Sequence, residues 1–250
     1  MKNKIFNREI CVCAHLTQTR HAQRMCAEMG IKMDKLIYEN PLACEADIRN
    51  FILEGQAKIS FEDGAMYMEN ALDASGGQKA NYVLWCPEIF PEEVRITWEF
   101  KPIREPGLCI LFFGAMGRNG ENPFSPDLQK RTGEYVQYHH GDINAFHVSY
   151  FRRKEPDERA FHTCNLRKSY GFHLVAQGGD PIPDVPDAKE FYQLEVVKKK
   201  DLVTFSVNGL EVFRYKDDGV TYGERLGKGC IGFRQLAPLV GAYRNLKVFA

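Results

Sequence analysis

Residues 191–215, FYQLEVVKKKDLVTFSVNGLEVFRY, carry the clearest strand pattern of the sequence. They contain three runs in which apolar and polar side chains alternate, as they do in strands with one buried face. Asn208-Gly209 joins the second run to the third, and this dipeptide between alternating runs is the strongest short-range signal for a β-hairpin. Residues 191–197, 202–207 and 210–215 are therefore predicted to form an antiparallel meander.

Strand patterns of the same kind continue on both sides of this meander. They lie at residues 57–61, 65–69, 94–100, 107–113, 229–235 and 242–249. Residues 107–113 are apolar on both faces, which is typical of a central strand between two layers. No repeat, low-complexity tract or linker interrupts residues 40–250. The sequence thus predicts an all-β fold, a single sandwich of two antiparallel sheets.

The composition limits the classes of partner. Lysine and arginine together number 33, as do aspartate and glutamate, so the formal net charge is zero. A chain with this balance has no overall field to attract nucleic acid or an anionic membrane. No run reaches the length of a membrane span, and the first residues lack the apolar core of a secretory signal. The eight cysteines are scattered, several within apolar runs, and are interpreted as buried thiols of a cytoplasmic protein.

Residues 1–32 differ from the remainder. Residues 17–30 contain no proline and little β-branching, and Gly30 is an end signal, so a short helix is predicted there. We interpret residues 1–32 as an N-terminal extension, helical or poorly ordered, and residues 33–250 as the sandwich domain. Met33 is the candidate initiator of that domain.

Residues 134–173 concentrate the side chains that suit binding or chemistry. Residues 135–140 and 145–151 are β-rich runs joined by Gly-Asp-Ile-Asn, and they predict a hairpin. In the second run, alternation places Phe146, Val148 and Tyr150 on one face and His147 and Ser149 on the other. One face is therefore expected to enter the core, while the other presents polar groups to a ligand.

Longer strings carry a resemblance to a known family. They are residues 96–103 (ITWEFKPI), 105–113 (EPGLCILFF), 137–153 (QYHHGDINAFHVSYFRR), 159–169 (RAFHTCNLRKS) and 171–176 (GFHLVA). Over residues 34–250 the chain is similar to the YesU-like family of unknown function, which is encoded with bacterial pectin-utilisation genes. The resemblance implies a concanavalin A-like jelly roll and a role in breaking down plant or other acidic polysaccharides. An intracellular protein that processes acidic oligosaccharides is the resulting expectation.

β-Elimination from a uronic acid sugar would use the residue types in this region. It needs a group that stabilises the sugar carboxylate, a base for the C5 proton and an acid for the leaving oxygen. His139, His147 and Tyr150 are the catalytic candidates, although Tyr150 can join the site only if a bulge changes the strand register. The candidate substrate-binding residues are Tyr135, Gln137, Ser149, Arg152, His162, Asn165 and Arg167.

Other functions remain open at this level. Retaining hydrolysis needs two carboxylates about 5 Å apart. Glu45-Ala-Asp47 lacks a second glutamate in the required pattern, and Glu99 and Glu134 are isolated. The same polar face could also bind an oligosaccharide ligand without catalysis, or the protein could act as an interaction partner of a pathway enzyme.

No metal or cofactor is expected at the histidines. His139 and His140 are adjacent, and neighbouring residues of a strand point to opposite faces, so they should not share an ion with Asp142. A structural calcium ion held by residues 217–219, Asp-Asp-Gly, is a separate candidate.

Overall fold

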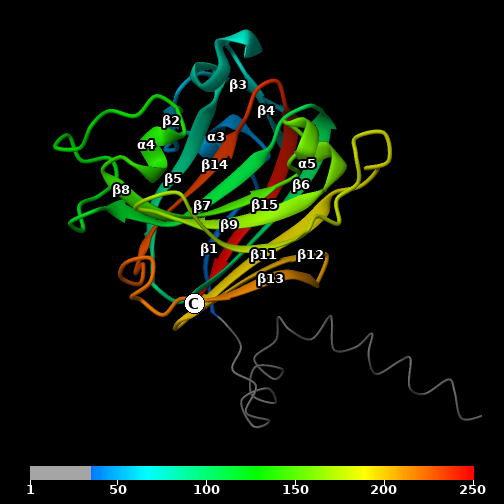
Figure 1. The fold of residues 1–250 in the computed structure, drawn as a ribbon. Coiled ribbons are helices and arrows are strands. Elements are labelled where there is room, and N and C mark those ends of the chain that lie inside the picture. The colour runs from blue at the N-terminus through cyan, green and yellow to red at the C-terminus, as the bar shows by residue number, and fades with distance from the viewer. Residues whose placement is uncertain (1–34) are drawn as a thin grey trace, which may run out of the picture. The chain divides into compact units, whose positions relative to one another are not determined.

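Residues 35–250 are described by the structure, a computed structural model, and they form a sandwich of two antiparallel sheets (Figure 1). The predictions for residues 1–32 concern a part of the chain outside the described residues. The jelly-roll fold class is confirmed. None of the helices in residues 35–250 is long and apolar enough to cross a membrane.

Sheet A has eight strands in the order β13-β12-β11-β6-β15-β4-β3, with β1 beside β15. These are β1 (Leu36–Asn40), β3 (Ala57–Glu62), β4 (Ala65–Asn70), β6 (Val94–Arg104), β11 (Tyr192–Lys199), β12 (Leu202–Val207), β13 (Leu210–Lys216) and β15 (Val240–Phe249). The predicted meander is confirmed as β11, β12 and β13. Its Asn208-Gly209 turn has φ angles of 49° and 77°, the left-handed conformation that these two residue types tolerate.

Sheet B has seven strands in the order β10-β9-β8-β7-β14-β5-β2. These are β2 (Ile52–Glu54), β5 (Tyr82–Phe90), β7 (Cys109–Gly117), β8 (Ile143–Tyr150), β9 (Thr163–Lys168), β10 (His173–Gly179) and β14 (Gly229–Gln235). Short helices lie between strands: α3 (Glu45–Ile48), the 3₁₀ helix η1 (Ala74–Ala80), α4 (Val136–His139) and α5 (Pro156–Ala160).

The main core lies between the sheets and follows the predicted alternation. Trp98 of β6 and Phe146 of β8 are fully buried there. Strand β7 is apolar on both faces because Phe113 enters this core while Phe112 belongs to a second apolar cluster on the outer face of sheet B. The interpretation of residues 107–113 as a central strand is thus confirmed.

The cysteines that the structure describes are all free thiols. Four of them are buried, as expected, whereas Cys44 is exposed.

The predicted strand at residues 135–140 is wrong. Val136–His139 forms the single helical turn α4, which the His140 N–H closes by donating to the Val136 carbonyl at 2.9 Å. The Tyr138 side chain explains the change: it is fully buried, and its hydroxyl donates to the Glu54 carboxylate at 2.7 Å. This tertiary contact outweighs the local β propensity of the run.

Candidate functional site

Polar side chains line up on the outer face of sheet B. Paired residues of neighbouring strands share a face, so each ladder row identifies residues that lie together. One row runs through Arg234, Ile110, Ser149, Asn165 and Gln177, and the next through Gly232, Phe112, His147 and Arg167. We call the residues of these rows on β8, β9 and β10 the polar face; they are His147, Ser149, Asn165, Arg167 and Gln177.

Residues 118–140, the covering segment, pack over the β5–β14–β7 side of the same face (Figure 1). Tyr138 of this segment packs against Phe112 and Trp85, with ring centroids 5.1 and 6.3 Å apart. Buried Glu54 accepts hydrogen bonds from Trp85 Nε1 at 2.9 Å, from Tyr138 and from Arg131 Nη2 at 2.7 Å. The segment is thereby fixed to sheet B, and it ends where the polar face begins.

His147 lies at this boundary and is fully buried. The Ser169 hydroxyl donates to the Ala145 carbonyl, so its oxygen accepts from His147 Nε2 at 3.2 Å. His147 Nδ1 is then the acceptor for the Tyr135 hydroxyl, 3.0 Å away. Burial, together with the charges of His139 and Arg234, holds the pKa of His147 well below its usual range. The ring is therefore neutral, with both of its nitrogens engaged.

His139, at the end of α4, is only partly buried. Its ring packs against Tyr135 and Phe172, with centroids 4.9 and 4.7 Å away, and its Nδ1 contacts Nδ1 of His140. Burial, then the charges of His140 and Arg167, lowers the pKa of His139 to about 4. Within residues 35–250, no hydrogen bond engages its Nε2 atom, which makes His139 the histidine of the site that is available to a ligand.

Arg234 of β14 is fully buried beneath the Tyr135 ring, whose centroid is 4.6 Å from its guanidinium carbon. Its Nη2 donates to Gln78 Oε1 at 2.9 Å and to the Gly133 carbonyl at 3.1 Å, while its Nε and Nη1 have no partner among the described residues. Burial lowers the pKa of Arg234 to about 10. A buried cation without a carboxylate is costly, so it is expected to be kept for more than stability.

Arg167 adds a second guanidinium beside His147. It donates to the Phe172 carbonyl at 2.8 Å and stacks 3.6 Å from the Phe172 ring centroid, but it makes no ion pair within residues 35–250. Burial and the charge of Arg152 lower its pKa. Arg152 is partly neutralised because its Nη2 lies 2.8 Å from Glu158 Oε1. The region around His147 thus carries an excess of positive charge.

The structure brings together most of the residues predicted from the sequence. His139, His147, Tyr135, Ser149, Asn165 and Arg167 meet on or beside the polar face, and Arg152 lies within electrostatic range of Tyr135 and Arg167. The side-chain amides of Asn165 and Gln177 approach to 2.8 Å, which extends the polar surface to β10.

Tyr150 is not part of the site. It lies fully buried between the sheets, where its hydroxyl accepts from Trp98 Nε1 at 3.2 Å. The register of β8 with β9 is regular from Phe146 to Ser149, so no bulge turns Tyr150 to the face of His147. The proposed catalytic role of Tyr150 is therefore corrected.

Gln137 and His162 also lie away from the polar face. The Gln137 side chain binds Thr132 within the covering segment, accepting from its backbone N–H at 2.7 Å. His162 faces Asp184, with Nε2 3.5 Å from Oδ1, in the cluster formed by Arg153. The partners of Gln137 and His162 explain the positions of both side chains without a ligand.

With this geometry in place, comparison with known proteins identifies the family. A family described as a domain of unknown function (DUF1961) matches residues 35–248. The chain belongs to this family. The uncharacterised protein YesU of Bacillus subtilis (strain 168) is 51% identical over 212 residues, which make up 85% of this chain and 94% of the relative. The resemblance detected in the sequence is confirmed.

Solved structures agree with the fold. A Bacillus subtilis protein of unknown function with a galectin-like fold is 50% identical, with a TM-score of 0.84 over 87% of this chain and 97% of that one. A β-glucanase of Bacillus licheniformis gives a TM-score of 0.53 at 7% identity, covering 88% of this chain and 99% of the enzyme. The carbohydrate-binding module CBM66 from Bacillus subtilis gives 0.50 at 9% identity, covering 80% and 95%. At such low identity, the glucanase and the binding module establish only a shared fold.

Sequence reasoning missed several residues of the site in this family member. The most important is Arg234, followed by Gln78, Ser169, Phe172 and Gln177. Arg234 was detectable in principle, because it is the one charged residue of a fully buried strand, Gly229–Gln235. Its neighbours Tyr135 and Gln78 are about 100 and 156 residues distant in sequence, so no local pattern could have grouped them.

The metal candidates do not assemble within residues 35–250. His139 and His140 meet because α4 replaces the predicted strand, but the Asp142 carboxylate instead accepts from the Gln129 N–H at 2.7 Å. At the proposed calcium site, Asp217 forms a buried ion pair with Lys168 Nζ at 2.8 Å. The Lys168 ammonium group occupies the position beside this carboxylate that a calcium ion would need, so the described residues do not fit calcium as they lie.

The burial of neutral His147 predicts a pH-dependent stability. The unfolded chain protonates this histidine near pH 6.5, whereas the folded chain does so only at much lower pH. The contribution of neutral His147 to the free energy of unfolding is therefore fully present above about pH 6.5 and is lost as the pH falls below that value. We expect His147→Gln to flatten the slope of unfolding free energy between pH 7 and 5 by up to about 1.4 kcal/mol per pH unit. Urea titrations at several pH values would show this, and an unchanged slope would contradict it.

Proposed function

We propose that this protein binds acidic oligosaccharides, such as those released from pectin, on the polar face of sheet B. The observation that carries the proposal is Arg167, a partly buried guanidinium group without a carboxylate partner among the described residues, with the buried guanidinium of Arg234 beneath Tyr135 adding positive charge. Planar guanidinium groups match carboxylates through paired hydrogen bonds. A sugar carboxylate is the anion expected in this place.

The remaining residues of the polar face suit the neutral parts of a saccharide. Gln177 provides an exposed amide group, and the nearly buried Ser149 and Asn165 lie behind it in the same ladder row. Phe172, which is 44% exposed and packs against the His139 ring, offers an apolar ring beside the polar face. Hydroxyl-rich ligands are bound by such combinations of a few directed polar groups and an aromatic surface. The expected cytoplasmic location would limit the ligand to short, imported oligosaccharides.

A second candidate function is β-elimination on the bound ligand, favoured by the available Nε2 atom of His139. In this reaction a base removes the C5 proton beside the carboxylate, the electrons form the C4–C5 double bond, and the C4–O bond breaks as the leaving oxygen gains a proton. Neutral His139 can accept a proton, and Arg167 would stabilise the carboxylate. A pKa of about 4 makes His139 a weak base, so binding is the better-supported function.

Mass spectrometry of di- and trigalacturonate incubated with the protein tests both functions. Elimination would give products whose summed mass equals that of the substrate, without added water, and His139→Gln should abolish them. Binding alone would give no product but a rise in melting temperature with galacturonates and none with neutral galactose oligomers. If the experiment gives no product and no selective rise in melting temperature, the proposed function is contradicted.

A further inference from the structure

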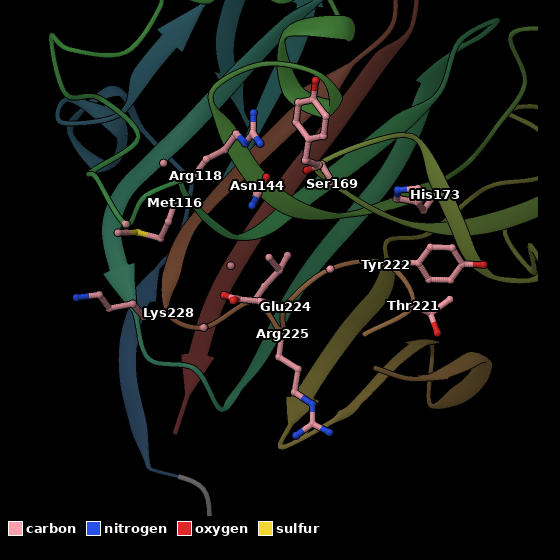
Figure 2. A pocket seen from close by; sticks show the side chains of 17 residues that line it. Met116, Arg118, Asn144, Ser169, His173, Thr221, Tyr222, Glu224, Arg225 and Lys228 are labelled. Atoms are coloured by element: carbon pink, nitrogen blue, oxygen red, sulfur yellow. The ribbon is translucent and has the colours of Figure 1, made fainter. Parts of the chain in front are cut away.

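A pocket of about 740 Å³ lies near one end of sheet B, apart from the polar face. It is formed by the ends of β7 and β8, the turn between β9 and β10, and residues 221–228 before β14. Figure 2 shows Arg118, Asn144 and Ser169 on one side and Glu224 across from them, with Tyr222 and His173 along another wall. Its size lies within the range of small-ligand pockets, about 300–1,000 Å³.

We propose that this pocket is a second saccharide site, which binds one sugar residue bearing a carboxylate. The choice of a sugar acid rests on the proposed function, whereas the properties of the pocket do not. Three properties of the pocket support a saccharide site: an excess of cations, a buried hydrogen-bond acceptor without a partner, and exposed aromatic rings.

The charges favour an anion. Arg118 and Lys228 line the pocket, and neither forms an ion pair within residues 35–250. Arg225 is turned away, with its Nε donating to the Asp217 carbonyl at 2.9 Å (Figure 2). The acidic side chain among the lining residues is Glu224, so the two available cations outnumber it. A monoanion would balance this charge.

The pocket also offers a position for a hydroxyl group. The Oδ1 atom of Asn144 is buried and accepts no hydrogen bond from the described residues. A buried acceptor without a donor is unfavourable, and a ligand hydroxyl that donates to it would remove the cost. A carboxylate alone could not do so, because it has no proton to donate at neutral pH. The ligand is therefore expected to carry both groups, as a sugar acid does.

Aromatic rings at the rim suit the apolar faces of a sugar. Tyr170 is 43% exposed, and the Arg118 guanidinium carbon lies 4.1 Å from its ring centroid. On another wall the rings of Tyr222 and His173 pack with centroids 4.8 Å apart. Aromatic side chains with one apolar face open are a common surface for a ring-shaped ligand.

Ser169 lies between the two proposed sites. It lines the pocket, while its hydroxyl oxygen accepts from His147 Nε2 at the edge of the polar face. The sites share this residue, but the arginines that define them are different, so each site can be altered separately.

Amide NMR of the whole chain during titration with D-galacturonate tests this inference. We expect two sets of signals to shift, those of Gly117 and Asn144 at the pocket and those of Ser149 and Asn165 on the polar face. A Cβ atom at Gly227, which lines the pocket, would meet no atom within 4 Å, so Gly227→Trp is the substitution chosen to fill the pocket. It should abolish the first set of shifts only, as should Arg118→Met through loss of charge.

The control for a surface tryptophan is Leu210→Trp, since Leu210 is 62% exposed on β13 of sheet A, outside both sites; both sets should persist. Arg167→Met should abolish the polar-face set only. If the pocket set alone is seen, this inference holds and the proposed function fails for this ligand. The inference is overturned if the pocket signals do not shift in the wild type, still shift in Gly227→Trp, or shift equally with neutral D-galactose. In each of these cases, shifts of the polar-face signals would still support the proposed function. If D-galacturonate shifts no signals, both are overturned.

Discussion

Replacing Arg131 by methionine is expected to lower the free energy of unfolding by about 3–5 kcal/mol. Arg131 Nη2 lies 2.7 Å from Glu54 Oε1, and their side chains are only 5% and 9% exposed. Loss of the guanidinium leaves the Glu54 carboxylate buried with Trp85 and Tyr138 as its remaining donors. Methionine keeps the aliphatic packing of the stem, so the loss reports on the ion pair and its hydrogen bonds.

Arg104→Met is the matched control for this change. Arg104 Nη2 lies at the same 2.7 Å from Glu69 Oε1, but the two side chains are 49% and 35% exposed. An ion pair in such a position contributes about 1 kcal/mol or less, because water screens it. Urea denaturation of both variants measures the difference. Equal losses would show that the Glu54–Arg131 pair does not hold the covering segment to sheet B.

The second large effect is expected at the ligand. Arg167→Met should weaken galacturonate binding about 10- to 150-fold, because a hydrogen bond to a charged group contributes about 1.5–3 kcal/mol. The melting temperature should change little, since Arg167 makes no ion pair within residues 35–250 and loses mainly its contact with the exposed Phe172 ring. Calorimetric titration with trigalacturonate, beside thermal melting, separates the two effects.

Arg214→Met provides the control for a general loss of positive charge. Arg214 lies on β13 of sheet A, where it pairs with Glu211 at 2.8 Å. Its replacement should leave galacturonate affinity unchanged. If both variants bind equally well, or if Arg167→Met only destabilises the fold, Arg167 does not contact the sugar carboxylate.

Much of the fold could be predicted from the sequence because strand structure is encoded locally. The period-two alternation of residues 191–215 and the Asn208-Gly209 turn specify three strands and their pairing. The same alternation correctly separated His147 and Ser149, on the outer face, from Tyr150 in the core. These residues are adjacent in sequence, so their relative directions follow from the pleat of one strand.

The composition of the site depends on contacts between residues that are distant in sequence. Residues 135–140 have strand propensity, but they became a helical turn because Tyr138 reaches Glu54, 84 residues earlier in the chain. Arg234 enters the site because β14 inserts between β5 and β7, which places it beneath Tyr135. Local sequence patterns thus specify the strands and the faces of their side chains. Which strands became neighbours, and hence which charges gathered around His147, depended on contacts between distant residues that no local pattern encodes.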